Sequence, residues 1–215
     1  MNFAHIVSHN LRSHTGNIEM ILNLLNEPQS QEETELYLMN LGKVSKNLSA
    51  TISHLNEIVS IQNKSSLKRE VLHFERILNI TKETLYSEIQ AEDVIITSDF
   101  DECPVIEYVS AYLDSIVLNL VGNAVKYRSM DRSCKIKVYT QVHNGRIQLV
   151  VEDNGLGIDL ELHGERLFGM YKTFHKNPNA RGIGLFITRN QIESQGRQIE
   201  VSSEVDKGTR FTITF

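Results

Sequence analysis

The first 62 residues limit the fold most strongly, because their apolar side chains recur at helical spacing with a single interruption. Residues 7–25 carry a seam position every three or four residues in alternation, as in a coiled coil or helix bundle. Residues 26–30 include Pro28, which interrupts a helix, and a second run with leucines every seven residues follows. The seam positions are Val7, Leu11, His14, Ile18, Ile21 and Leu25, then Leu41, Val44, Leu48, Ile52, Leu55, Ile58 and Val59.

Two helices that bury a single stripe against each other are marginal in isolation. We therefore expect residues 1–62 to form a helical hairpin that pairs with a second copy of the chain, giving a four-helix bundle. The polar residues 63–66 are the predicted linker to a second domain, residues 67–215.

The histidines of the first helix differ in their predicted environment. His14 falls on the seam, so it is predicted to be a packed core histidine or a polar residue that fixes the register. His9 is two residues from Val7, a rotation of about 200° around a helix, and should face solvent. An exposed histidine is available to react. His5 and His9 are one turn apart, but two ligands are too few for a stable zinc site.

From residue 67 onwards the pattern changes to short apolar runs typical of strands, separated by three helical stretches. His143, Asn144 and Gly145 form a predicted hairpin turn. The fold class is therefore α+β: the helical hairpin, then an α/β sandwich with a mixed, mainly antiparallel sheet. The predicted strands are 71–74, 94–98, 135–142, 146–153, 198–205 and 209–215. The predicted helices are 75–89, 111–127 with Ser110 as N-cap, and 183–194 ended by Gly196.

The composition excludes several classes of function. The 215 residues include 22 basic and 27 acidic side chains, a formal net charge of -5, which argues against broad electrostatic binding to nucleic acid or to an anionic membrane. Cys103 and Cys134 lie far apart, which fits a reducing cytoplasm and indicates neither a disulfide framework nor a zinc site. No apolar run is long enough to span a bilayer, so we expect no membrane contact by this chain and a cytoplasmic location.

Two glycine-containing stretches suggest a nucleotide site. DNGLGI (residues 153–158) follows a strand that ends in a carboxylate, and a buried Asp153 there can accept a hydrogen bond from an exocyclic amine such as that of adenine. ARGIGLFITRN (residues 180–190) places Gly182 and Gly184 where a helix begins, and backbone N–H groups at such an end attract phosphate. Taken alone, DNG is also a common turn, and a GxG before a helix can reflect close packing.

LNLVGNAVKYR (residues 118–128) strengthens this interpretation. Asn119 and Asn123 are one turn apart on one helix face, and Lys126 and Tyr127 follow a turn later. Amide oxygens can help coordinate a hydrated Mg²⁺, lysine can neutralise phosphate, and tyrosine can lie against a purine. Asparagine pairs on a helix are usually solvated, but this stretch is otherwise apolar, which favours a pocket.

The order of these motifs resembles the catalytic core of a sensor histidine kinase. SHNLR is similar to the family's H box, NLVGNAVKY to its N box and DNGLG to its G1 box. RLFGMYKTF resembles a variant F box, ARGIGL the G2 box and KGTRFTITF the final box. The resemblance implies a dimerisation and histidine phosphotransfer hairpin over residues 1–62. It also implies a catalytic ATP-binding domain of the gyrase, Hsp90, histidine kinase and MutL type, the Bergerat fold, over residues 67–215. The chain could then be a fragment of a larger sensor.

The resemblance also implies roles for individual residues. ATP and Mg²⁺ would bind beneath a lid at about residues 171–181, and the γ-phosphoryl group would pass to His9 and then to an aspartate of a response regulator receiver domain. Asp153 would read the adenine amine, Asn123 would hold Mg²⁺ with help from Asn119, and Lys126 would contact phosphate. The remaining pocket and lid residues would be Tyr127, Gly155, Gly157, Gly182, Gly184 and Thr209.

Three positions depart from the family pattern. Asn10 stands where the family has a carboxylate that accepts the imidazole proton, so it can orient the ring of His9 but is no useful base. His14 replaces a proline, with Gly16 as an alternative point of flexibility. In the lid, Ala180 replaces a glycine, and the expected basic residue is Lys172, Lys176 or Arg181, of which we favour Lys172.

Two other functions stay open at this point. The chain could act mainly as a phosphatase or phosphotransfer scaffold on a receiver domain, with Ser13 orienting water; the amide at Asn10 favours this reading. Alternatively, it could be a nucleotide-sensing interaction module without turnover.

Overall fold

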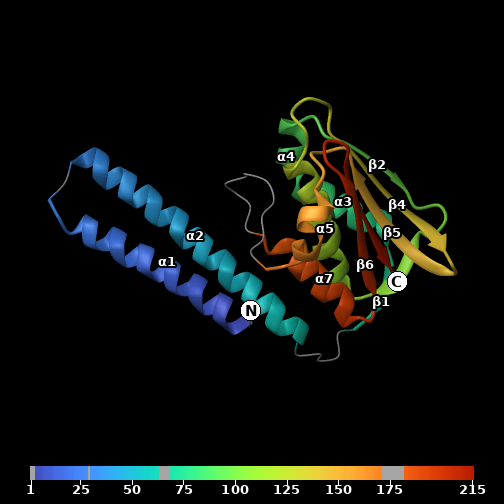
Figure 1. The fold of residues 1–215 in the computed structure, drawn as a ribbon, viewed down its shortest axis with the longest axis horizontal. Helices are drawn as coiled ribbons and strands as arrows, with labels where there is room; N and C mark the ends of the chain where they lie inside the picture. Colours follow the sequence, from blue (N-terminus) through green and yellow to red (C-terminus); the bar gives the residue numbers. More distant parts are fainter. Residues whose placement is uncertain (1–2, 29, 63–67, 171–181) are drawn as a thin grey trace. The chain divides into compact units, whose positions relative to one another are not determined.

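The computed structural model of the chain describes residues 3–28, 30–62, 68–170 and 182–215 (Figure 1). The side chains of residues 3–10, 50, 53–54, 57–62 and 165 also lie outside the description. The chain divides into two compact units, residues 1–62 and 63–215.

The first unit is a pair of helices, α1 (Phe3–Leu25) and α2 (Gln31–Gln62), as the seam pattern predicts. Ser30 begins α2 with a capping box. Its hydroxyl oxygen accepts from the backbone N–H of Glu33 at 3.3 Å, and the Glu33 carboxylate accepts from the Ser30 backbone N–H at 2.9 Å. The Glu33 carboxylate also accepts from the Ser30 hydroxyl at 2.8 Å, and these bonds from the backbone and side chain of Ser30 lower the pKa of Glu33.

The contact between α1 and α2 follows the predicted seams, with one exception. Ile21 is buried, and Leu11, Ile18, Leu25, Leu41, Val44, Leu48 and Leu55 are half-buried. The prediction that Ile52 packs on this seam is wrong, because its side chain is exposed and its neighbour Thr51 is buried instead. Ile58 and Val59 fall among the side chains outside the description.

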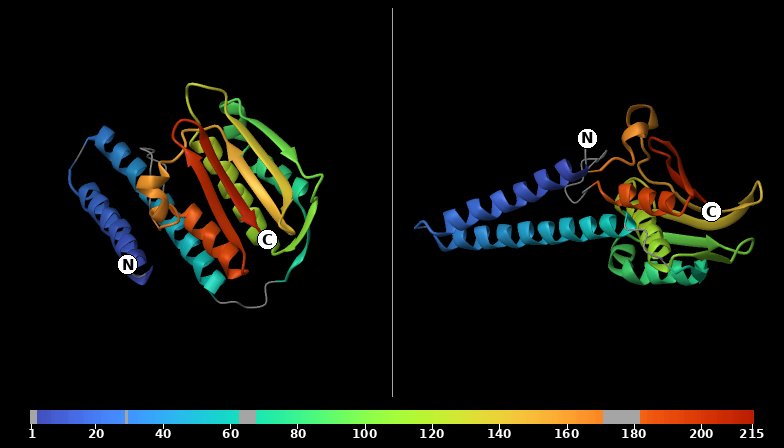
Figure 2. Two further views of the ribbon diagram at one scale, coloured as in Figure 1. Left: turned by 45° about the vertical axis from the view of Figure 1, so that its right-hand side comes forward. Right: turned by 90° about the horizontal axis from the view of Figure 1, so that it is seen from below.

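The second unit has helices packed on one face of a five-stranded sheet, an arrangement visible in Figure 1 and in both views of Figure 2. The strand order is β2-β4-β5-β7-β6; β2 runs parallel to β4 and all other pairs are antiparallel. The predicted α+β class and mixed sheet are confirmed. The strands are β2 (Ile95–Asp99), β4 (Lys135–His143), β5 (Arg146–Asp153), β6 (Gln198–Glu204) and β7 (Gly208–Thr214).

Helix α5 (Ser110–Lys126) lies between α3 (Phe74–Thr84) and α7 (Gly184–Ser194). Its apolar face is fully buried, with Leu113 and Ile116 each 0% exposed. The other helical elements are α4 (Tyr86–Ala91), α6 (Leu160–His163) and the 3₁₀ turn Gly164–Arg166.

Several local predictions differ from the structure. The predicted helix 75–89 is two helices separated at Leu85. Ser110 is not the N-cap of α5: Val109 caps it without a side-chain bond, and the Ser110 hydroxyl points to the Asp114 carboxylate at 3.4 Å. A further strand, β3 (Val105–Tyr108), pairs with β1 (Glu70–His73) in a small separate sheet.

The two turns assigned from glycines are confirmed. Asn144 and Gly145 have φ values of 51° and 72°, the left-handed pair that a two-residue hairpin between β4 and β5 requires. Gly196 has φ 71° and follows the end of α7, where a left-handed residue terminates the helix.

Candidate functional site

Asp153 ends the central strand β5 on the face that packs against the helices. Its Oδ1 accepts hydrogen bonds from the backbone N–H groups of Gly155, at 2.8 Å, and Thr209, at 3.3 Å. Burial raises the pKa of Asp153 to about 6, although these two donors pull in the opposite direction. Among the described residues no protein donor contacts the other carboxylate oxygen, Oδ2.

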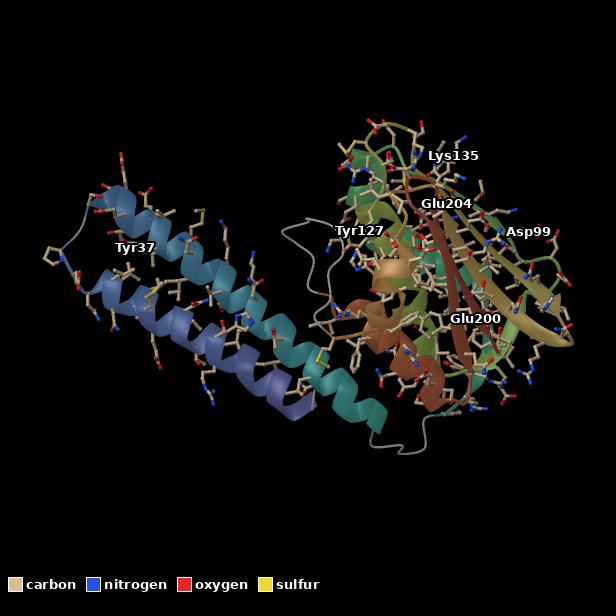
Figure 3. The ribbon with its side chains drawn as sticks, in the orientation of Figure 1. Tyr37, Asp99, Tyr127, Lys135, Glu200 and Glu204 are labelled. Atoms are coloured by element: carbon tan, nitrogen blue, oxygen red, sulfur yellow. The ribbon has the colours of Figure 1, made fainter. Side chains whose placement is uncertain are left out.

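The turn after Asp153 is packed so tightly that only glycine fits at two positions. A Cβ on Gly155 would lie 2.5 Å from the carbonyl oxygen of Tyr127, and a Cβ on Gly157, where φ is 67°, would overlap the carbonyl oxygen of Glu204. The backbone N–H of Leu156 donates to the Tyr127 carbonyl at 3.0 Å. The DNG turn is therefore fixed between the end of α5 and the β6–β7 turn. Figure 3 labels Tyr127 and Glu204, which flank it.

Thr209 and Ser203 form the polar floor beneath this turn. Thr209 is buried, and its hydroxyl lies 2.9 Å from the hydroxyl of Ser203. Ser203 also accepts from the backbone N–H of Ile158 at 2.8 Å. Sequence reasoning identified Thr209 but missed Ser203, because the serine stands in an ordinary alternating strand pattern that carries no sign of its partners.

Helix α5 presents the predicted polar residues along the same region. Asn123 is half-buried, and its backbone oxygen accepts from the Tyr127 N–H at 2.9 Å. The Lys126 ammonium lies 5.5 Å from the centre of the Tyr127 ring, a cation–π distance. Burial raises the pKa of Tyr127 above its ordinary value. Amide, cation and aromatic ring thus gather in the last turn of α5.

Asn119 has a different environment from Asn123. Its Nδ2 donates to the Thr188 hydroxyl at 2.7 Å, and a Cβ on Gly184 would overlap its Oδ1. Gly184 is the first residue of α7, and Gly182 precedes it with φ 64°. The two G2 glycines therefore lie where a helix begins, as predicted, and Gly184 allows α7 to pack closely against the Asn119 side chain.

The predicted lid lies outside the described residues. This covers residues 171–181, including Lys172, Lys176, Ala180 and Arg181. Among the described residues there is no group of three histidine, cysteine or carboxylate side chains that could bind a metal ion.

The predicted phosphoacceptor region is in α1. The backbone of His9 and Asn10 is helical, and their side chains are outside the described part. Ser13, one turn after His9, is exposed. His14 is half-buried and its Nε2 lies 3.3 Å from the Thr51 hydroxyl, which donates its own proton to the Asn47 carbonyl at 2.9 Å. His14 therefore packs against α2, which supports the prediction that it is a core histidine.

Comparison with known proteins identifies the second unit. Residues 109–215 match the family of histidine kinase-, DNA gyrase B- and HSP90-like ATPases. This part of the chain belongs to that family. The boxes that contain Asn119, Asn123, Asp153 and the G2 glycines all fall inside the matched ATPase domain.

Two curated relatives extend the similarity to the helical hairpin. The signal transduction histidine-protein kinase ArlS of Staphylococcus haemolyticus is 27% identical over 228 residues, which cover 99% of this chain and 48% of ArlS. The histidine protein kinase SaeS of Staphylococcus aureus is 24% identical over 81% of this chain and 51% of SaeS. The chain spans about half the length of these relatives, and its similarity to these histidine kinases includes the helical hairpin as well as the ATPase domain.

Solved structures show the same fold at lower identity. The Acinetobacter baumannii histidine kinase AdeS has a TM-score of 0.71 at 18% identity and covers 98% of this chain and 96% of its own. ShkA, solved in complex with AMPPNP, has a TM-score of 0.65 at 19% identity, covering 98% of this chain and 44% of its own. ThkA, in complex with the response regulator protein TrrA, has a TM-score of 0.64 at 18% identity, covering 99% and 59%.

Proposed function

We propose that the chain is a two-component histidine kinase core that transfers the γ-phosphoryl group of ATP to His9 and from there to an aspartate of a response regulator. The observation that carries this proposal is Asp153. It is a half-buried carboxylate inside an ATPase domain, with Oδ1 held by two backbone donors and Oδ2 left to accept an exocyclic amine. The same chain carries His9 on a helical hairpin.

The described residues fit ATP. Gly155 and Gly157 let the turn after Asp153 pack against the backbone of Tyr127 and Glu204, and Lys126 and Tyr127 supply a cation and an aromatic face. Asn123 is the amide we assign to Mg²⁺. Asn119 has a more structural environment, since its Nδ2 is bonded to Thr188. When bound, Mg²⁺ would neutralise phosphate charge, and the remaining residues would bind and orient the nucleotide.

The proposed phosphoryl transfer to His9 requires no general base from the protein. The lone pair of one imidazole nitrogen attacks the γ-phosphorus, and the bond to the β,γ-bridging oxygen breaks with ADP as the leaving group. The displaced imidazole proton passes to water, because Asn10 can orient the ring but cannot accept the proton. Catalysis would come from positioning and electrostatics.

The partners we propose follow from the surface of the hairpin and from the relatives. Large apolar side chains are exposed on both helices, which favours a homodimer through a four-helix bundle. They are Met20, Leu22, Leu36, Leu38, Met39 and Ile52. A receiver domain is the proposed protein substrate, supported by the similarity to ThkA, whose structure contains a response regulator.

The location we propose is the cytoplasm, where ATP is available. Cys103 and Cys134 are both buried free thiols, consistent with a reducing compartment. No helix among the described residues is long and apolar enough to cross a membrane. We do not propose nucleic acid as a partner, because the net charge of -5 disfavours broad electrostatic binding to a polyanion.

One labelling experiment tests this function. The chain is incubated with γ-labelled ATP and Mg²⁺, and bound label is tested for acid lability and alkali stability, the signature of phosphohistidine. His9→Gln should abolish the label, whereas His14→Leu should keep it and remain a folded dimer. Persistence of label in His9→Gln would reject His9 as the acceptor. ATP binding without any phosphohistidine would instead indicate a nucleotide-sensing module.

A phosphatase role is the second candidate, favoured by the exposed Ser13 and the amide at Asn10 one turn from each other on α1. It predicts that the chain accelerates loss of phosphate from a phosphorylated receiver domain and that Ser13→Ala abolishes this acceleration. A receiver that loses phosphate at the same rate with and without the chain would exclude it.

A further inference from the structure

Arg132 lies in the connection between α5 and β4, and its guanidinium group binds backbone carbonyl groups of two other loops. Nε donates to the carbonyl oxygen of Asn154 at 2.7 Å, and Nη2 donates to those of Gly155 at 2.7 Å and Asp206 at 2.5 Å. Asn154 and Gly155 belong to the DNG turn, and Asp206 belongs to the β6–β7 turn. The ion pairs of the described residues do not include Arg132, so its donors serve these carbonyls rather than a carboxylate.

The DNG turn also binds back to the segment that carries Arg132. The Asn154 side chain accepts from the backbone N–H of Lys135 at 2.8 Å and donates to the carbonyl of Ser133 at 2.9 Å. Arg132 and Asn154 therefore hold the two segments together from both sides. Such a reciprocal arrangement leaves the guanidinium group little freedom to rotate, although Arg132 is exposed.

The β6–β7 turn matters because it delivers one of the two donors to Asp153. Asp206 has φ 60°, a left-handed conformation, and its N–H donates to the Leu156 carbonyl at 2.8 Å. Three residues later, the Thr209 N–H reaches Asp153 Oδ1. The other donor, the Gly155 N–H, lies in the DNG turn itself. A displacement of either turn would therefore move a donor away from the Asp153 carboxylate.

We propose that Arg132 is a positioning residue of the nucleotide site: it clamps the DNG turn, whose Gly155 N–H orients Asp153, to the β6–β7 turn, which leads into the strand that carries the Thr209 N–H. The proposal rests on the proposed function, in which Asp153 reads the adenine amine. Arg132 acts through Asp153 and needs no contact with the nucleotide. A guanidinium group suits this role because its planar fork offers several donors at fixed angles, whereas a lysine ammonium is a point donor on a flexible stem.

The test measures ATP·Mg²⁺ affinity by calorimetry with the full 215-residue chain. We expect Arg132→Ala to weaken ATP binding by between about threefold and thirtyfold. The affinity of Arg132→Lys should lie between those of Arg132→Ala and the wild type. Arg210→Ala is the matched control. It removes the same charge and two hydrogen bonds to Glu152, and should change the affinity by less than about twofold.

A double-mutant cycle with Asp153→Asn separates positioning from general support. If Arg132 acts through Asp153, Arg132→Ala should weaken ATP binding by less than about twofold in the Asp153→Asn background. Fully additive losses would overturn the proposal, as would unchanged affinity in Arg132→Ala. Should Arg132→Ala fail to fold, Arg132→Lys takes its place, and wild-type affinity in that variant would be equally decisive against the clamp.

A second measurement does not depend on nucleotide. Amide hydrogen exchange should be faster at Gly155 and Thr209 in Arg132→Ala than in wild type, with exchange in the middle of β5 unchanged. Equal protection of both amides would overturn the proposal. A wild-type chain that binds no ATP would instead reject the proposed function, and the exchange measurement would still decide whether Arg132 holds the two turns.

Discussion

The helical hairpin and the ATPase domain reach their structures through different kinds of contact. In the hairpin, only Ile21 and Thr51 are buried among the described side chains, and six large apolar residues stay exposed. In the ATPase domain, residues from distant segments close the core completely, so that Leu113 and Ile116 are inaccessible to solvent. The periodic sequence thus determines the helices of the hairpin, but a single chain does not bury all of their apolar side chains. We therefore expect hairpin stability to depend on protein concentration, and ATPase-domain stability not to.

The largest expected effect tests this difference directly. Leu113→Ala should destabilise the ATPase domain by about 2–5 kcal/mol, because it leaves a cavity among fully buried neighbours. Its matched control is Leu48→Ala in the half-buried hairpin seam, whose effect should shrink as the protein concentration rises. Urea unfolding at several chain concentrations measures both. A concentration-independent transition for the hairpin would contradict the proposed dimer.

Asp153→Asn should separate stability from binding in the ATPase domain. ATP affinity should fall by about 1.5–3 kcal/mol, the range for a hydrogen bond to a charged group, because the amide NH₂ would face the adenine amine. Stability at pH 7.5 should rise by roughly 1–3 kcal/mol, because the variant removes a buried carboxylate whose pKa is raised to about 6. Calorimetry and urea unfolding measure the two quantities. A variant that loses both stability and affinity would show that Asp153 is structural.

The pKa of Asp153 also predicts how ATP affinity depends on pH. The folded domain holds this proton more tightly than the unfolded chain, so its contribution to stability falls as pH rises from about 4 to about 6 and is constant above. The carboxylate accepts the amine only when ionised. ATP affinity should therefore be about tenfold weaker at pH 5 than at pH 7.5. In Asp153→Asn the ATP affinity should lack the pH dependence that Asp153 causes and keep only the part caused by titration of the ATP phosphates. Identical pH profiles of ATP affinity in wild type and Asp153→Asn would assign the whole change to ATP.

Sequence patterns predicted the fold where the information is local. The bounds of α1 and α2, the turn at Asn144 and Gly145, and the five strands of the main sheet follow from period and turn residues. Strand β3 was missed because four residues that pair with a partner more than thirty positions earlier leave no local signal. The contacts of Arg132 were missed for the same reason, because its three acceptors are backbone oxygens on distant loops. Residue types alone cannot reveal such a contact.

Thr51 shows how a seam can deviate from its periodic pattern. The sequence placed Ile52 on the seam, but α2 turns Thr51 inwards, where its hydroxyl meets His14 and the carbonyl of Asn47. His14 and Thr51 form a polar pair on the seam that is satisfied by hydrogen bonds. A rotation of α2 that buried Ile52 in place of Thr51 would leave His14 without this partner. The exposed Ile52 then becomes available to the proposed second copy.

Asn10→Glu tests whether the hairpin contributes more than a scaffold. A carboxylate next to His9 would accept the imidazole proton, and a positioned general base is typically worth about 10²–10⁴-fold. We expect a realised gain of about tenfold or less in single-turnover labelling, the result expected where delivery of His9 to the nucleotide, and not proton transfer, sets the rate. Equal rates in both proteins over several pH values, with unchanged ATP affinity, would leave Asn10 as an orienting group.

The smallest expected effect concerns the polar pair on the hairpin seam. Thr51→Val keeps the side-chain volume but removes the hydroxyl that bridges His14 and Asn47, so the hairpin should lose about 0.5–1.5 kcal/mol of stability. His14→Leu in the same background should recover part of this loss, because replacing both partners with apolar groups removes the unsatisfied imidazole. Urea unfolding of the four proteins of this cycle, at one fixed chain concentration, gives the coupling. A coupling near zero would mean that His14 and Thr51 are neighbours without a working hydrogen bond, and that apolar contacts alone set the register of α1 against α2. A clear coupling would assign His14 to packing, consistent with the proposal that His9 and not His14 accepts the phosphoryl group.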